Sequence, residues 1–436
     1  MSPAEHPDSL PGRDILGHDV YERGVPHAVY DEYRRLAPVA WVNETGPLAT
    51  TATGHHGSGF WSLTAHADVV AVHKDWRTFS SEVGGTEIEE LEHDQEALAA
   101  RRTMLETDPP RHTKLRQLVN PIFSRVAVET YAAHAEQLMA EVLADAVAAG
   151  ERDGEVDGVA AVARELPIRM ITGLLGVPDE DAPQLFHWAD QIVYNADPDY
   201  SPAVSDRTDT DPYRLLPFRS PVSLTVLDYI RRLAAARRGV PGGDVLTALS
   251  NALVDGEPLT EREQGTFFLL LLIAGNETTR HALAQGLLVL AQHPDALPQL
   301  RADPSLLDTA TEEVLRWTCP QLHFRRTATV DTVLGGVRIA AGEKVVTWYA
   351  AANFDPAVFP DPHVFDIARS PNRHVTFGGG GPHLCLGQWM ARLEVRTFLA
   401  ALTERVERVE LTGEPRRVRS NFINGLKSLP ILLVPR

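Results

Sequence analysis

Cysteine is scarce in this chain: only Cys319 and Cys385 occur among 436 residues. Two thiols cannot build the disulfide framework of a small secreted protein, and a reducing cytoplasmic environment is the simpler expectation. Two thiols also cannot hold an iron–sulfur cluster, which takes four cysteines. The sequence therefore argues against both a disulfide-built fold and a built-in iron–sulfur domain.

Basic residues are also in deficit, since 41 Lys and Arg stand against 59 Asp and Glu and give a formal net charge of -18. Nucleic-acid phosphates need a basic surface, so this balance excludes nucleic acid as the main partner. It also disfavours an anionic membrane surface.

Long apolar runs are missing as well. The longest, residues 267–274, is far shorter than the roughly 20 residues that span a bilayer. Residues 1–14 are polar and acidic, without the basic start and apolar stretch of a signal peptide. We therefore expect a cytoplasmic protein without a membrane anchor, in which residues 1–16 form a flexible segment.

Most of what remains has helical periodicity. Residues 39–42 and 60–63 are typical of short strands, whereas residues 128–148 carry apolar side chains at helical spacing. Residues 151–158 are predicted to form a polar loop. Residues 195–213, rich in Asp, Pro, Ser and Thr, are predicted to be a loop or lid rather than part of the core.

A long helix is predicted over residues 260–293. Thr260 and Glu263 form a capping-box start, and Pro294 ends the pattern. The helix has about 33 residues and a length of roughly 50 Å. Because it is apolar through residues 267–273, it must run through the core of one large domain. This favours a single domain over residues 1–436, against the two or three that length alone suggests.

The C-terminal half adds a small β portion. Helices are predicted over residues 306–318 and 386–406, and residues 325–349 alternate like strands. Residues 352–377 are rich in loops, and the chain ends in β-like runs. The expected fold class is mainly α with a small β portion.

A glycine-rich segment precedes the second cysteine: residues 377–387 read F-G-G-G-G-P-H-L-C-L-G. Four glycines bring the backbone close to something flat or bulky. Cys385 stands just before a helix, where free N–H groups and the helix dipole favour a thiolate. Gly387 leaves room for a ring against that helix. Taken alone, a buried structural cysteine would be the favoured alternative.

The middle of the long helix reads A-G-N-E-T-T over residues 274–279. Glu277 and Thr278 offer a carboxylate beside a hydroxyl, a pair suited to relaying protons into a dry site. Gly275 and Asn276 are weak helix formers and permit a local opening. The alternative is a threonine pair that bonds back to the preceding turn, with Glu277 on a solvated face.

Two further motifs are weak when taken singly. Glu313 and Arg316 share one helix face at i, i+3, as many surface pairs do. Residues 108–116 read D-P-P-R-H-T-K-L-R and set His112 and Arg116 four apart on one face. Ordinary surface cations are the alternative there.

In this order and spacing, the motifs resemble the cytochrome P450 family from about residue 17 to the last residue. The glycine loop resembles the family's cysteine-ligand signature, in a form with one more residue between Phe and Cys than the commonest one. The resemblance implies the cytochrome P450 fold, with a long central helix over haem b and O2 as co-substrate. It makes Cys385 the axial iron ligand, whose thiolate favours O–O cleavage.

The resemblance also implies roles for the other residues. Glu277 and Thr278 match the family's catalytic acid–alcohol pair. Glu313, Arg316 and Arg369 match a structural ion-pair triad. The residues expected to bind haem are His112, Arg116, Arg326 and His383 at the propionates, together with Phe377, Ala274, Cys385 and Gly387.

Finer features resemble bacterial enzymes that oxidise steroid side chains, branched lipids or terpenoids, and they lie in residues 274–280, 316–327 and 419–427. Gln321 is polar where a lipid pocket favours an apolar residue. Cys319 is interpreted as a small buried hydrophobe. The expected substrate-lining residues are Leu271, Gln321, Leu322, Phe422 and Ile423.

The expected function is a monomeric haem-thiolate monooxygenase acting on a hydrophobic small molecule, with electrons from a separate ferredoxin and ferredoxin reductase. The alternatives are a peroxide-driven haem-thiolate hydroxylase and a non-catalytic haem-binding sensor or carrier. The intact Glu277–Thr278 pair argues against both. A ferredoxin is expected beside the cysteine loop, at Arg111, Lys114, Arg392 and Arg396, where Glu394 is the only acid of the second cluster.

Overall fold

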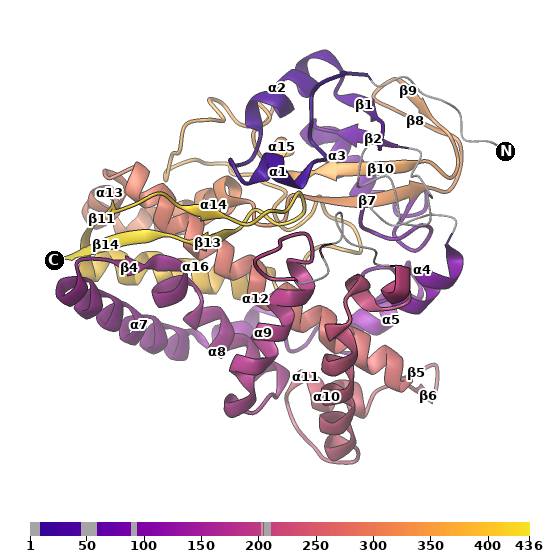
Figure 1. Cartoon of the computed structure of the whole chain (residues 1–436), viewed down its shortest axis with the longest axis horizontal. Helices are drawn as coiled ribbons and strands as arrows, with labels where there is room; N and C mark the ends of the chain where they lie inside the picture. The colour runs from indigo at the N-terminus through magenta and orange to yellow at the C-terminus, as the bar shows by residue number, and fades with distance from the viewer. Residues whose placement is uncertain (1–8, 45–58, 89–93, 202–203, 205–210) are drawn as a thin grey trace.

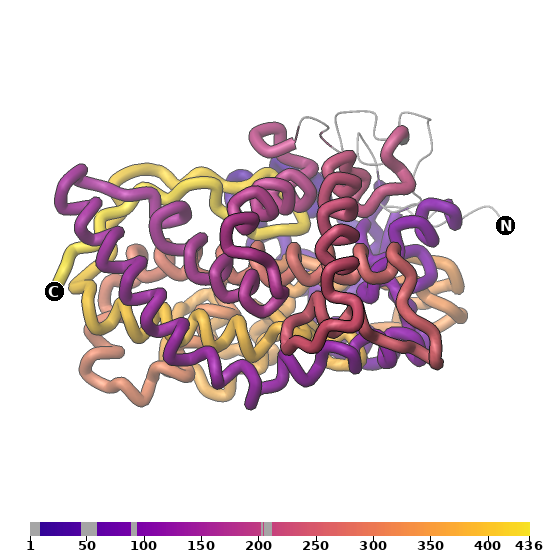
Figure 2. The backbone as a smooth tube through the Cα atoms, turned by 90° about the horizontal axis from the view of Figure 1, so that it is seen from below, coloured from indigo at the N-terminus to yellow at the C-terminus, as the bar shows by residue number. Residues whose placement is uncertain are grey.

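A computed structural model describes residues 9–44, 59–88, 94–201, 204 and 211–436. Helices form most of the fold, and two smaller sheet regions lie apart from each other, one with β1, β2, β7 and β10 and one with β4, β11 and β14 (Figure 1). Seen from below, helices cover the molecule from end to end (Figure 2). The predicted fold class, mainly α with a small β portion, is confirmed.

The long central helix α12 (Glu261–Gln292) follows the sequence prediction closely. The Thr260 side chain accepts a hydrogen bond from the Glu263 N–H, and the Glu263 side chain accepts one from the Thr260 N–H, which completes the capping box. His293 is the C-cap and Pro294 follows it. Nearly every side chain from Gln264 to Ile273 and from Thr279 to Leu290 is buried, because other helices surround α12.

The α-helices that pack most extensively on α12 are α8 (Glu165–Leu175), α10 (Val222–Arg237), α14 (Leu307–Thr318) and α16 (Gln388–Arg405). Helices α14 and α16 agree with their predictions to within two residues at each end. The remaining α-helices are α1 (His18–Tyr21), α2 (His27–Leu36), α3 (His66–Lys74), α4 (Gln95–Arg101), α5 (Arg111–Gln117), α6 (Arg125–Glu129), α7 (Ala132–Asp153), α9 (Ala182–Val193), α11 (Val245–Ser250), α13 (Ala296–Ala302) and α15 (Tyr349–Ala352).

A five-stranded sheet has the order β1-β2-β10-β7-β3, so it combines three strands near the N-terminus with two strands from residues 323–348. Its strands are β1 (Val39–Val42), β2 (Phe60–Leu63), β3 (Phe79–Ser80), β7 (His323–Ala328) and β10 (Lys344–Trp348). Strand β10 is parallel to β2 and antiparallel to β7, so the segment that follows α14 is fixed against the N-terminal strands. A separate hairpin, β8 (Thr332–Leu334) and β9 (Val337–Ile339), completes the strands predicted within residues 325–349.

A second sheet, in the order β11-β14-β4, corrects the prediction of a polar loop over residues 151–158. Helix α7 continues to Asp153, and β4 (Val156–Asp157) pairs with β14 (Pro430–Pro435), which also pairs with β11 (Val406–Leu411). The partner strand lies far along the chain, so local polarity could not indicate it. The predicted helix over residues 128–148 is likewise two helices, α6 and α7, because Ser124 caps a separate first turn.

Two further predictions are corrected in part: the flexible segment over residues 1–16 and the loop or lid over residues 195–213. Residues 1–8 lie outside the described residues, but Ile15 and Leu16 are buried in the core beside the five-stranded sheet rather than flexible. Residues 202–203 and 205–210 also lie outside, whereas Tyr194 and Asp197 are fully buried. Asp197 accepts hydrogen bonds from the Arg419 N–H and from the Lys427 ammonium, both at 2.8 Å, so the start of the expected lid belongs to the core.

Within the described residues, no helix is both long enough and apolar enough to cross a membrane.

Candidate active site

The glycine-rich loop before α16 is closed by a hydrogen bond from the Cys385 N–H to the Phe377 carbonyl, at 2.9 Å. Gly381 has φ +74°, and a Cβ on it would lie 2.0 Å from the His73 carbonyl oxygen of α3. A Cβ on Gly379 would lie 2.8 Å from the Val70 Cα. We expected these glycines to approach something flat or bulky. The partner of these two is the backbone of α3, and their role is to let the loop pack against that helix.

Gly387 behaves differently from the glycines earlier in the loop. It is the N-cap of α16, and a Cβ placed on it would meet no atom within 4 Å. The space in front of it belongs to a cavity of about 280 Å³. Cys385, Phe377 and Gly387 line one wall of this cavity, so the helix start leaves free room on the side that the cysteine faces.

Cys385 is half-buried at the cavity wall, and burial raises the pKa of its thiol. The Gly387 N–H and the charges of Arg116 and Arg392 oppose that rise. A buried thiol with a donor and two cations nearby is held as a thiolate when a further positive charge joins it. The site is therefore suited to a cysteine that binds a metal ion.

Four basic residues converge on the same cavity from three parts of the chain. His112 and Arg116 come from α5, Arg326 from β7 and His383 from the loop. The rings of His112 and His383 lie 4.2 Å apart. Among the described residues, neither Arg116 nor Arg326 forms an ion pair with a carboxylate; they donate to the carbonyls of Pro382 (3.2 Å) and Arg325 (2.7 Å).

Among the described residues, no carboxylate pairs directly with this cluster; Asp108 and Glu106 act on Arg326 only through their charges, and burial still lowers its pKa. Burial and the charge of Arg116 lower the pKa of His112 to about 4, and burial with Arg326 lowers the pKa of His383 well below its ordinary value. His112 Nδ1 and His383 Nε2 are buried and without a hydrogen-bond partner in the described part of the chain. Buried cations and orphaned ring nitrogens are costly unless an anion joins them, so the cluster fits a ligand that carries carboxylates.

On the opposite wall of the cavity, α12 presents Ala274 and Thr278. The Thr278 hydroxyl donates to the Ala274 carbonyl at 2.9 Å, and α12 is unbroken here, so the expected local opening is absent from this part of the helix. Gly275 has a packing role instead, because a Cβ on it would lie 2.6 Å from Ile171 of α8.

Glu277 is 1% exposed, which contradicts the alternative of a solvated face. Its carboxylate accepts hydrogen bonds from the hydroxyl of Tyr194 and the guanidinium of Arg280. The same guanidinium lies 3.1 Å from Asp190 of α9. Burial raises the pKa of Glu277 well above its ordinary value; Arg280 opposes this rise and Asp190 adds to it.

Sequence reasoning missed most of this network. Tyr194 and Asp190 stand more than 80 positions before Glu277 and carry no motif. Arg280 could have been found, because it follows Glu277 at the i+3 spacing of an ion pair on one helix face. His281, one turn after Glu277, also contacts Tyr194.

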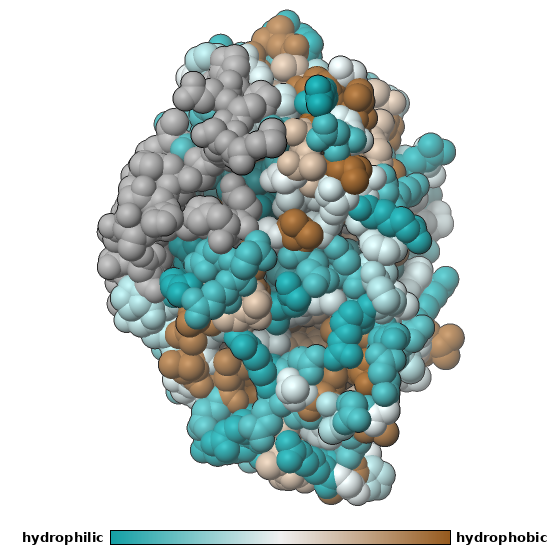
Figure 3. Space-filling model, turned by 90° about the vertical axis from the view of Figure 1, so that its right-hand side faces the viewer, coloured by the Kyte–Doolittle hydropathy of each residue, from teal (hydrophilic) through white to brown (hydrophobic). Residues whose placement is uncertain are grey.

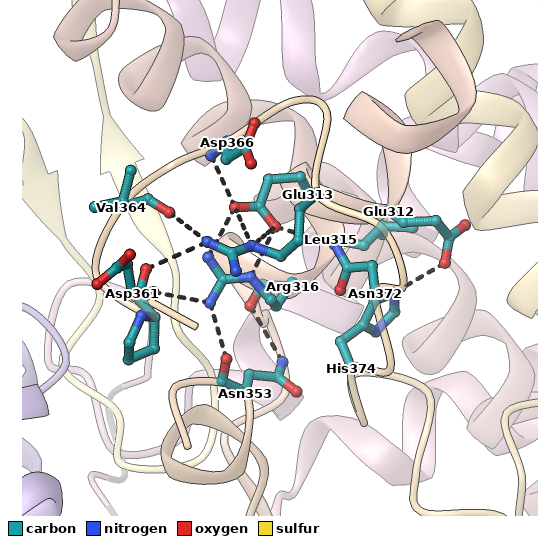
Figure 4. Close-up of polar contacts among 12 residues, drawn as sticks. Glu312, Glu313, Leu315, Arg316, Asn353, Asp361, Val364, Asp366, Asn372 and His374 are labelled. Carbon is teal, nitrogen blue, oxygen red and sulfur yellow. Dashed lines mark hydrogen bonds and ion pairs between the residues drawn. The ribbon is translucent and has the colours of Figure 1, made fainter. Parts of the chain in front are cut away.

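Glu313 and Arg316 lie at the centre of a network of polar contacts (Figure 4), and Arg369 also binds Glu313. Arg316 binds Glu313 through two hydrogen bonds of 2.8 Å, and Arg369 Nε donates to the same carboxylate at 3.2 Å. Glu313 and Arg316 are both fully buried. Burial alone would raise the pKa of Glu313, but the hydrogen bonds and charge of Arg316 lower it.

This triad is connected to the loop that precedes the cysteine. Arg316 donates to the Asn353 carbonyl at 2.8 Å, and the Asn353 amide donates to the Thr376 hydroxyl at 2.9 Å. Thr376 immediately precedes Phe377 and lines the cavity. The ion pairs thus hold α14 and the long loop segment in one arrangement.

Of the five expected substrate-lining residues, four line the cavity and one does not. Gln321 forms an isolated antiparallel bridge with Ile423, and successive residues of an extended segment point to opposite sides. Leu322 therefore points away and packs into the core beside the five-stranded sheet. Cys319 is buried as expected, and this burial raises the pKa of its thiol to about 12.

Comparisons with known proteins agree with this geometry. The sequence model of the family described as Cytochrome P450 matches residues 241–425. A steroid C26-monooxygenase of Mycobacterium tuberculosis is 35% identical over 424 residues, which cover 97% of this chain and 92% of the relative. The linalool 8-monooxygenase of Pseudomonas putida is 36% identical over 430 residues, covering 97% of this chain and 99% of the relative.

Solved structures give the same result. A Mycobacterium marinum cytochrome P450 in complex with pseudoionone superimposes with a TM-score of 0.86 at 34% identity. The match covers 98% of this chain and 100% of that one.

Proposed function

Since the chain belongs to the cytochrome P450 family and is a haem-thiolate monooxygenase, we propose that its chemistry takes place in the cavity between Cys385 and Thr278. The observation that carries the proposal is the meeting of three features in this one cavity. They are a cysteine before a helix, a basic cluster without a direct ion pair among the described residues, and a hydroxyl on α12.

The residues fit haem b. The two propionates supply the negative charges that His112, Arg116, Arg326 and His383 lack, and the orphaned ring nitrogens gain acceptors. Cys385 gives the thiolate, and the open space at Gly387 accommodates the edge of a flat ring, with Phe377 and Ala274 beside it. When bound, haem supplies the iron at which O2 is reduced and one oxygen atom is transferred to the substrate.

Proton supply is the task proposed for Glu277 and Thr278. Thr278 Oγ1 faces the cavity and holds its own proton on the Ala274 carbonyl, so its lone pairs can accept a further proton donor. Burial raises the pKa of Glu277 well above its ordinary value, which favours a carboxyl that holds a proton. To pass it on, Glu277 must exchange its hydrogen bonds with Tyr194 and Arg280 for one that leads to the cavity.

The proposed substrate is a hydrophobic small molecule such as a steroid, terpenoid or branched lipid. Relatives named for each class cover nearly the whole chain: steroid C26-monooxygenase, linalool 8-monooxygenase and methyl-branched lipid omega-hydroxylase. This chain supports the proposal through the apolar residues that line the cavity, which include Leu270, Leu271, Ile171, Val193 and Phe422.

We propose that a monomer receives its electrons from a ferredoxin and its reductase. The four cations expected at the docking face all have acidic partners: Arg111 with Glu263, Lys114 with Asp255, Arg392 with Glu312 and Arg396 with Asp308. Glu394, expected as the only acid there, is instead 1% exposed. The positive field of this face is therefore weaker than the sequence indicates, and a ferredoxin has to compete with these partners.

The decisive experiment compares wild type with Cys385→His by the absorption spectrum of the reduced carbon monoxide complex. Wild type is expected to show a thiolate-type Soret band, and Cys385→His to lose it. The same band in both proteins would exclude Cys385 as the ligand. Turnover with ferredoxin and reductase, set against turnover with peroxide alone, separates the monooxygenase from a peroxide-driven hydroxylase; product from neither would indicate a sensor or carrier.

A further inference from the structure

We infer that the side-chain carbonyl of Gln321 is a fixed hydrogen-bond acceptor that selects substrates carrying a hydroxyl group. The inference rests on the proposed function, because it assigns a substrate feature to the same cavity. It concerns a residue whose polarity is unexpected in a pocket for apolar molecules.

The backbone of Gln321 is held between two segments of the chain. It forms an isolated bridge with Ile423; on either side of it, the Leu322 N–H donates to the Phe422 carbonyl at 2.9 Å and the Asn424 N–H donates to the Pro320 carbonyl at 2.8 Å. The side chain starts from a rigid position on the cavity wall.

The orientation of the Gln321 amide follows from its partners. The Nε2 group donates to the His323 carbonyl at 2.9 Å and to the Phe422 carbonyl at 3.2 Å. An NH2 group has two hydrogens, so both are used. Turning the amide over would set Oε1 against two carbonyl oxygens and lose both hydrogen bonds. The amide is therefore locked with Oε1 away from these carbonyls.

Oε1 accepts no hydrogen bond from any residue that the structure describes, and the side chain remains partly exposed where it lines the cavity. Its neighbours on this wall include the aromatic rings of Phe324 and Phe422, which lie 5.6 Å apart, and the side chain of Ile423. An apolar ligand that displaces solvent here leaves Oε1 without a partner, which is costly. A ketone or ether oxygen cannot satisfy Oε1 either, because it too can only accept a hydrogen bond.

A hydroxyl group satisfies this acceptor, and a site built to bond a donor discriminates strongly against analogues that lack it. The fitting substrate is thus an apolar molecule with a hydroxyl held at Gln321. The carbon that is oxidised lies elsewhere in the molecule, toward the wall formed by Thr278.

The test uses matched ligands: linalool with its methyl ether, and cholesterol with cholest-4-en-3-one. Dissociation constants are measured from the Soret shift for wild type and Gln321→Met, a variant of similar length without the amide. Wild type is expected to bind the alcohol about tenfold more tightly than its partner in at least one pair, and Gln321→Met to bring that ratio close to one. The loss should fall on the alcohol, whereas the ether or ketone keeps its affinity.

Three results would overturn the inference: equal affinities within both pairs in wild type, an unchanged ratio in Gln321→Met, or no shift with either alcohol. A parallel loss for both members of a pair would show a merely structural effect and also count against it. The thiolate band of the carbon monoxide complex is recorded for both proteins. Its absence in wild type refutes the proposed function, whereas its presence with an unchanged ratio refutes only the role of Gln321.

Discussion

Glu277 and Thr278 are neighbours in α12, yet their side chains have different surroundings. The Glu277 carboxylate is buried and bonded to Tyr194 and Arg280, whereas the Thr278 hydroxyl donates to the Ala274 carbonyl, and both residues line the cavity. A proton that passes between them depends on a movement of Glu277 away from residues near the end of α9. Proton supply is thereby linked to the residues directly after α9, of which Asn195 and Ala196 line the cavity.

We expect Thr278→Ala to bind haem and substrate normally but to divert electrons to peroxide, because it removes the hydroxyl that faces the cavity. Glu277→Gln should lower the rate of product formation, because an amide cannot carry the proton. The measurement is product formed per NAD(P)H consumed, together with peroxide released. Thr279→Ser, which keeps a hydroxyl on the adjacent buried residue, serves as the control. Unchanged coupling in both variants would refute the role of the pair.

The ion-pair triad should govern stability and haem content rather than chemistry. Arg316→Ala leaves the buried carboxylate of Glu313 with Arg369, Asn372 and the Asp366 N–H, and breaking such a pair costs about 3–5 kcal/mol. We expect a lower urea midpoint and less haem per polypeptide. Arg338→Ala, which breaks the exposed pair with Asp331, should change the free energy of unfolding by less than about 1 kcal/mol. A stable, fully haem-loaded Arg316→Ala protein would contradict this prediction.

Local chemistry was enough to predict several elements from the sequence. Both ends of α12 follow from the Thr260 capping box and Pro294, and the cavity-lining residues around Cys385 follow from the motifs of a known family. Contacts between distant segments could not be predicted. Tyr194 meets Glu277 only because α9 packs on α12, and β4 is a strand only because β14 lies beside it. Leu322 was misassigned because the bridge at Gln321 sets which side chain faces the cavity.

Two glycines of the loop should respond differently to an added side chain. Gly381→Ala places a side chain on a residue whose backbone is left-handed and brings its Cβ into close contact with His73. We therefore expect a loss of about 1–3 kcal/mol in the free energy of unfolding. Gly387→Ala adds a Cβ that meets no protein atom within 4 Å but fills space at the cavity, so it should lower haem content with little change in the stability of the haem-free protein. Both are measured by urea unfolding and by haem per polypeptide. Equal effects of the two variants on both quantities would contradict the distinction.

A ferredoxin that docks beside the cysteine loop should be sensitive to Lys114 and Arg396, which are exposed on α5 and α16. Lys114→Glu and Arg396→Glu should slow ferredoxin-driven reduction at low salt, because rim charges act mainly on association rate. Arg392 is a poor choice, since it also lies over the ring of Phe377 in the loop.

The control for this docking test is Arg338→Glu, a charge reversal at another exposed, ion-paired cation. It should leave the ferredoxin-driven rate unchanged, and dithionite should reduce all variants normally. The face of the molecule seen in Figure 3 mixes hydrophilic side chains with smaller hydrophobic groups. Equal ferredoxin-driven rates for wild type and both reversals would place the docking site elsewhere.

Glu394 gives the last prediction, which concerns pH. It is 1% exposed on α16, its Oε2 atom has no partner among the described residues, and burial raises its pKa to about 8. Between the ordinary value of 4.5 and about 8, the folded protein keeps a proton that the unfolded chain has lost. The free energy of unfolding therefore falls as pH rises through this range, by up to about 1.4 kcal/mol per pH unit, and then levels off.

Glu394→Gln is neutral at every pH and should remove this slope. Relative to wild type, the free energy of unfolding of the variant should rise steadily between pH 5 and pH 8. In this range only the folded wild type must either bury a negative charge or keep a proton that its unfolded chain has released. Urea unfolding of the haem-loaded protein at a series of pH values measures the difference. Glu404→Gln, on the exposed side of the same helix, should follow wild type throughout. A difference between Glu394→Gln and wild type that stays constant from pH 5 to pH 9 would mean that the Glu394 carboxyl does not keep its proton in the folded state.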